Sequence, residues 1–63
     1  MKVLKEYLVT VYSEVTLNRK GAYTLYGENY NEVLDKANTR SNKNEVFVLA
    51  YKGESVFEDW MLV

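Results

Sequence analysis

Acidic side chains near an expected helix start are the residues of this sequence best placed to do chemistry. Glu28, Glu32 and Asp35 can lie on one side of that helix. Carboxylates grouped in this way could bind a hard cation or a basic partner. The same acids would also be stable as a solvated helix face, because negative charge is favoured near the positive end of the helix dipole. The solvated face is the favoured interpretation, and we predict no metal and no cofactor.

The common catalytic side chains are missing from the sequence. Its 63 residues include no His and no Cys, which excludes Ser-His and Cys-His nucleophile systems, disulfides and Cys/His zinc sites. The serines, Ser13, Ser41 and Ser55, have no candidate base close in sequence. Glu58 and Asp59 are adjacent, so on a strand they would point to opposite faces. We therefore predict that the protein is not an enzyme.

Aromatic side chains form the second group of interest, with six Tyr, two Phe and one Trp in this short chain. The stretch ESVFEDWMLV places acids beside large apolar residues, a composition suited to a basic groove on another protein. The stretch could equally be a last strand that buries Trp60 to complete a small core. The candidate partner-binding residues are Tyr12, Tyr26, Phe57, Trp60 and Met61.

Single-stranded nucleic acid is the alternative partner. Aromatic residues on a sheet can stack bases, and Tyr12, Tyr26, Phe47 and Tyr51 are of the right type. The basic residues are scattered along the chain, however, and the net charge of −1 gives no long-range attraction to a polyanion. A protein partner is therefore the first expectation.

The first half of the sequence predicts a β-hairpin. Apolar residues alternate from Lys5 to Leu17, which indicates a strand with one apolar face. The turn is expected at Asn18-Arg19-Lys20-Gly21, and Ala22 to Tyr26 would return antiparallel. The apolar face of the first strand carries Tyr7, Val9, Val11, Val15 and Leu17. The residues expected to share a face with the helix are Tyr7, Val9, Val11, Val15, Tyr23 and Leu25.

A helix is predicted directly after this hairpin. Asn29 is a suitable N-cap, and Glu32 follows three residues later, as in a capping box. The helix is expected to end near Asn38 to Arg40. Its apolar stripe consists of Tyr30, Val33, Leu34 and Ala37, with Leu34 buried in the middle.

Two more strands are expected after the helix. Glu45 to Tyr51 is rich in Val, Phe and Leu, Lys52 to Ser55 suits a turn, and Val56 to Val63 can form a last strand. The predicted order is ββαββ in a single domain, residues 1–63. The fold class is α+β, a small and mostly antiparallel sheet with one helix packed on one face.

One helix is too little to cover such a sheet. The second face would show Leu8, Thr10, Tyr12, Thr24 and Tyr26, and leftover apolar surface of this kind usually marks a contact. The sheet could instead fold its edges over itself. We expect a homodimer rather than a monomer, because closed two-fold pairs are the commonest oligomers.

The passage AYTLYGENYNEVLDKAN followed by EVFVLAY, residues 22–51, resembles the layout of small bacteriophage host-takeover proteins. Among these it is most similar to the short RNA-polymerase inhibitors of T7-like phages. The chain departs from them by its expected fourth strand and by lacking a strong acidic strip, so no binding residues are carried over. The resemblance implies a small protein without catalytic chemistry that acts by occupying a surface of a host protein.

These observations predict a non-enzymatic interaction module, of phage type, that modulates or inhibits a host protein through an aromatic and apolar surface. The sequence has no signal peptide and no apolar run of the roughly 20 residues that a membrane span needs. We therefore expect a cytoplasmic protein that does not enter the membrane.

Overall fold

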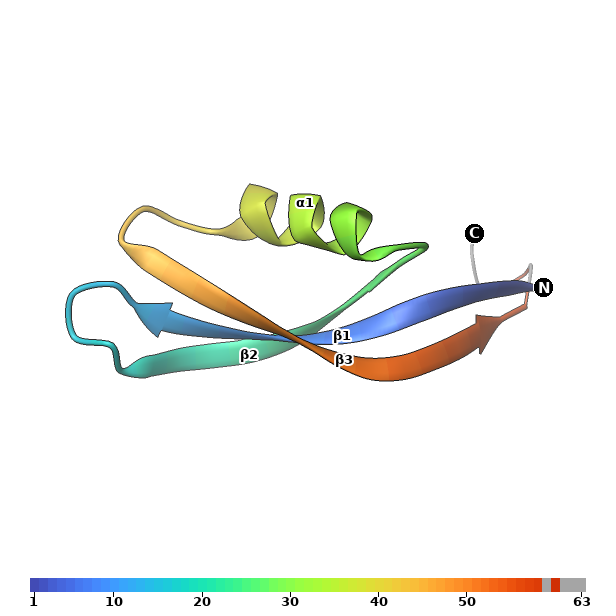
Figure 1. Cartoon of the computed structure of the whole chain (residues 1–63), viewed down its shortest axis with the longest axis horizontal. Coiled ribbons are helices and arrows are strands. Elements are labelled where there is room, and N and C mark those ends of the chain that lie inside the picture. Colours follow the sequence, from blue (N-terminus) through green and yellow to red (C-terminus); the bar gives the residue numbers. More distant parts are fainter. Residues whose placement is uncertain (59, 61–63) are drawn as a thin grey trace.

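A computed structural model describes residues 1–58 and Trp60. Within these residues the chain forms β1 (Lys2–Ser13), β2 (Arg19–Gly27), α1 (Tyr30–Arg40) and β3 (Glu45–Phe57). The strands make one antiparallel sheet in the order β2-β1-β3, and α1 lies on one side of it (Figure 1). The α+β class is confirmed, but the order is ββαβ rather than the predicted ββαββ.

The hairpin turn lies earlier in the chain than predicted. The Ser13 side-chain oxygen accepts hydrogen bonds from the amides of Val15 and Thr16, and its carbonyl accepts one from Leu17. Leu17 takes a positive φ of 62°, which reverses the chain direction. β1 therefore ends at Ser13. Val15 and Leu17, predicted on the apolar face of the first strand, are instead exposed in the turn, and Gly21 lies inside β2.

The predicted turn at Lys52 to Ser55 is a β-bulge. Glu6 of β1 is paired with Gly53, whereas the next residue, Tyr7, is paired with Tyr51, so Lys52 is an extra residue in β3. Gly53 has a φ of 128°, a conformation that favours glycine. The strand continues through this point to Phe57. The prediction of a separate strand over Val56 to Val63 is therefore wrong at its beginning, and residues 59 and 61–63 lie outside the described part.

The helix begins as predicted. Asn29 is the N-cap, and its side-chain oxygen accepts a hydrogen bond of 2.9 Å from the Glu32 amide. The Glu32 carboxylate accepts one of 2.8 Å from the amide of Glu28, one residue before the cap. Lys36 lies 3.5 Å from the Glu32 carboxylate, one helical turn away. The Glu32 amide in the first turn of α1 and the Glu28 amide just before the cap thus both have acceptors.

A small core lies between α1 and the sheet. Val9, Val33 and Ala37 are fully buried, and Tyr7 and Leu25 are nearly so. Val33, not Leu34, is the central side chain of the helix stripe, since Leu34 is only half-buried and Tyr30 is exposed. Four partly buried side chains surround the core: Val11, Tyr23, Phe47 and Leu49.

Gly27→Ala is expected to destabilise the fold. A Cβ at this buried position would lie 2.7 Å from Cγ2 of Val33, which is itself fully buried and has no room to move. We expect a loss of roughly 1–3 kcal/mol in unfolding free energy, measured by urea denaturation. Gly21→Ala is the matched control, because nothing lies within 4 Å of its Cβ position. Equal stability of the two variants would contradict this packing.

Asn29→Ala is expected to lower stability by about 1 kcal/mol, because the Glu32 amide loses its acceptor. Asn31→Ala, an exposed change in the first turn of the same helix, should cost little. Thermal denaturation of both variants measures the difference, and an unchanged midpoint for Asn29→Ala would show that the cap contributes nothing.

Candidate protein-interaction surface

The face of the sheet opposite α1 has no helix over it in the described part of the chain (Figure 1). Because side chains alternate along a strand, this open face carries the even-numbered residues of β1 and the residues paired with them. Its members are Lys2, Leu4, Glu6, Leu8, Thr10 and Tyr12 of β1, Arg19, Ala22, Thr24 and Tyr26 of β2, and Val46, Val48, Ala50, Gly53, Ser55 and Phe57 of β3.

The middle of the open face is apolar and accessible. Val48 retains 56% of its accessible surface, and Val46 and Ala50 beside it are also exposed. The charged members of this face are Lys2 at one end, Arg19 at the other and Glu6 between them, and the Glu6 carboxylate accepts a 3.0 Å hydrogen bond from Ser55. The Glu6 carboxylate thus has a polar neighbour, while the β3 side of the face offers aliphatic surface to solvent.

The predicted partner-binding residues do not form a single cluster. Tyr26 and Phe57 meet on the open face, with ring centroids 5.1 Å apart and planes at 84°. Tyr26 is paired with Glu6 of β1, and Tyr12 lies six residues further along the same strand. The two tyrosines are therefore about 20 Å apart along the sheet. Trp60 is 76% exposed, so it does not complete the core. Met61 lies outside the described residues.

A second aromatic group lies on the helix side of the sheet. Tyr7 contacts Tyr30 at 5.9 Å and Tyr51 at 5.3 Å between ring centroids. The outer two rings are about half exposed. This group was not predicted as a site, because the pairing of Tyr7 with Tyr51 depends on the bulge in β3.

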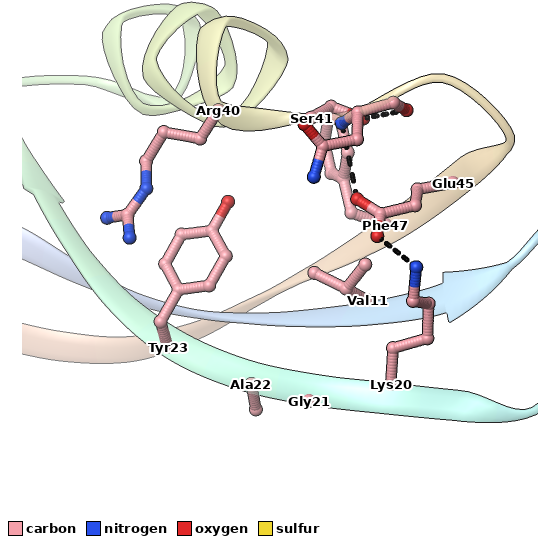
Figure 2. A pocket seen from close by; sticks show the side chains of 10 residues that line it. Val11, Lys20, Gly21, Ala22, Tyr23, Arg40, Ser41, Glu45 and Phe47 are labelled. Atoms are coloured by element: carbon pink, nitrogen blue, oxygen red, sulfur yellow. Dashed lines mark hydrogen bonds and ion pairs between the residues drawn. The ribbon is translucent and has the colours of Figure 1, made fainter.

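A hollow of about 350 Å³ lies between the end of α1 and strands β2 and β3 (Figure 2). The Arg40 guanidinium lies 4.1 Å from the centre of the Tyr23 ring, a cation–π contact. Lys20 and Glu45 form an ion pair on the other side. The remaining lining residues are Val11, Gly21, Ala22, Ser41, Asn42 and Phe47. A small acidic or aromatic group would fit the chemistry of this hollow.

Several of the ionised groups are paired with each other or with backbone amides. The Glu45 carboxylate is paired with Lys20 and accepts a 3.2 Å hydrogen bond from the Asn42 amide. Both contacts lower the pKa of Glu45. The hydrogen bond from the Glu28 amide lowers the pKa of Glu32, and the nearby Lys36 acts in the same direction. Glu28 forms a 2.8 Å ion pair with Lys2, which raises the lysine pKa. In the described part of the chain no three potential ligands are grouped to hold a metal ion.

Comparison with models of protein families, with curated proteins and with solved structures gave no match. Among the described residues no helix is long and apolar enough to cross a membrane. The exposed open face, the aromatic contacts and the hollow beside Arg40 are therefore the observations on which a function can be based.

Acid is expected to weaken the link between β2 and β3 made by Glu45. Its folded-state pKa lies below the unfolded value, so the link stabilises the fold above the ordinary glutamate pKa of about 4.3. This contribution is lost as the pH falls through the folded-state pKa. Urea midpoints measured between about pH 7 and pH 3 should therefore fall more steeply for the wild type than for Glu45→Gln.

Glu54→Gln, an exposed change on the same strand, controls for the loss of one negative charge. Parallel pH profiles of the wild type and Glu45→Gln would show that the pair with Lys20 does not contribute to stability.

Proposed function

We propose that this protein is a non-enzymatic interaction module that binds another protein through the open face of its sheet. The observation that carries the proposal is the exposed aliphatic surface around Val48 on a face without a covering helix. Apolar surface of this kind on a small protein usually marks a contact site. Tyr26 and Phe57 at one end and Tyr12 at the other would supply aromatic anchors for a partner.

The charge distribution supports a protein over single-stranded nucleic acid. Stacking platforms for nucleic acid normally lie in a positive field. Arg19, paired with Tyr12, is placed at the end of the open face, but Lys20 is engaged by Glu45 and Lys2 by Glu28. An uncharged or mixed protein surface therefore fits the open face better.

The mode of action follows from the resemblance of residues 22–51 to small phage inhibitors of host enzymes. A module without catalytic chemistry acts by covering a surface that its partner needs. We accordingly propose that the protein modulates or inhibits a host protein and acts in the cytoplasm.

Substitution of the open-face tyrosines tests the proposal. Tyr12→Ala and Tyr26→Ala should each weaken binding of a partner captured from bacterial lysate, by roughly 30-fold for an anchor residue worth about 2 kcal/mol. Tyr30→Ala is the matched control, because Tyr30 is a half-exposed ring on the helix side. Affinities would be measured with the purified partner, and circular dichroism would check that each variant is folded.

Two results would count against the proposal. One is that Tyr30→Ala weakens binding of the captured partner as much as the open-face variants do. The other is a blue shift of Trp60 fluorescence on titration with single-stranded oligonucleotides at low salt, together with no stoichiometric protein partner. That second result would favour the nucleic-acid alternative.

A further inference from the structure

The outer edge of β3 is an unpaired row of backbone groups. β3 is an edge strand, and in the described part of the chain Val46–Tyr51 forms no backbone hydrogen bonds other than its pairing with β1. The sequence of this segment, VFVLAY, is uncharged over six residues and contains no proline. An apolar edge of this length is a template for pairing with another strand.

The opposite edge of the sheet is protected in several ways. β2 begins with Arg19 and Lys20, and glycines at 21 and 27 weaken its tendency to pair. The Lys36 ammonium also donates a 2.7 Å hydrogen bond to the Tyr26 carbonyl on this strand. The two edges of one sheet thus differ, and the lack of protection is specific to β3.

We propose that the β3 edge pairs with β3 of a second copy of this chain, antiparallel and about a two-fold axis at Val48, so that Val48 of one copy lies opposite Val48 of the other. Such pairing joins two three-stranded sheets into one sheet of six strands. The apolar run of each copy then lies opposite the apolar run of the other. This pairing is made by the backbone groups of the β3 edge, whereas the proposed partner site is the side-chain surface of the open face. Val48 belongs to both, but pairing of the edge does not depend on partner binding.

The charges at the ends of the run favour the antiparallel arrangement. Glu45, which is paired with Lys20 in its own chain, precedes the run, and Lys52 follows it. In an antiparallel pair the Glu45 end of one strand lies beside the Lys52 end of the other. A parallel pair would place Glu45 beside Glu45 and Lys52 beside Lys52, and such like-charge neighbours destabilise paired strands.

The exposed area of the chain supports a second copy as the occupant. The chain exposes 4603 Å², compared with about 4200 Å² for a compact monomer of this mass. Its radius of gyration is 13.1 Å, compared with about 11 Å for a compact domain of this length. A standard interface buries about 800 Å² per partner. The chain therefore exposes more surface than a compact monomer of its mass, and a closed pair of copies can cover such surface without another component.

Sedimentation equilibrium across micromolar concentrations tests the pairing. The wild type is expected to dimerise, and Val48→Lys should raise the dimer dissociation constant roughly tenfold or more, because it places two ammonium groups near the axis and removes apolar contact. Thr24→Lys is the control, since Thr24 is exposed on the same open face but lies on β2. Thr24→Lys should leave the dimer dissociation constant unchanged. If Val48→Lys does not fold, Ala50→Lys serves as the edge variant in its place.

A charge swap provides a sharper test. Val48→Lys mixed with Val48→Glu should form a heterodimer tighter than either variant forms alone, because opposite charges then face each other across the axis. A monomeric wild type would overturn the proposal. So would a dimer insensitive to both edge variants, or one that Thr24→Lys also dissociates, since the latter would indicate pairing through the open face.

Discussion

The close approach of Val33 to Gly27 determines how α1 lies on the sheet. A methyl group at Gly27 would be 2.7 Å from the valine side chain, so a larger residue would force the helix or this side chain to shift. Because α1 begins three residues after Gly27, its first turn is fixed directly above the end of β2. Val33 then reaches the sheet, where it and Val9 are both fully buried.

The length of the helix limits how much of the sheet this contact can cover. Eleven helical residues span about 16 Å, whereas the molecule is 42 Å long. The helix therefore covers part of one face and leaves the open face without a cover. The hollow beside Arg40 has the same origin, because it lies where α1 ends and the chain leaves for β3 (Figure 2). Arg40 partly covers this gap by stacking on Tyr23.

Features that depend on neighbouring residues could be predicted from the sequence. The Asn29 cap and the alternation of β1 up to Ser13 are of this kind, since each is set within a few residues. The structural roles of the glycines are harder to predict, because Gly21 and Gly53 both suit a turn. A positive φ at Gly53 serves a turn or a bulge equally well. Pairing with β1, a long-range contact, decides between them.

The same limit applies to the candidate site. The open-face positions of Leu8 and Tyr12 follow from alternation alone. The contact between Tyr26 and Phe57 depends on the register of two strands on either side of β1, which no local pattern encodes. The group of Tyr7, Tyr30 and Tyr51 likewise requires the bulge and the helix position together.

The edge of β3 and the open face are oriented so that both can be used at once. A two-fold axis perpendicular to the sheet keeps the two open faces of a pair on the same side, so Val48 and its neighbours from both copies form one continuous surface. A partner with two binding segments would then meet both faces, and its second contact would form at a high effective concentration. Self-pairing would therefore strengthen partner binding without adding a contact to either open face.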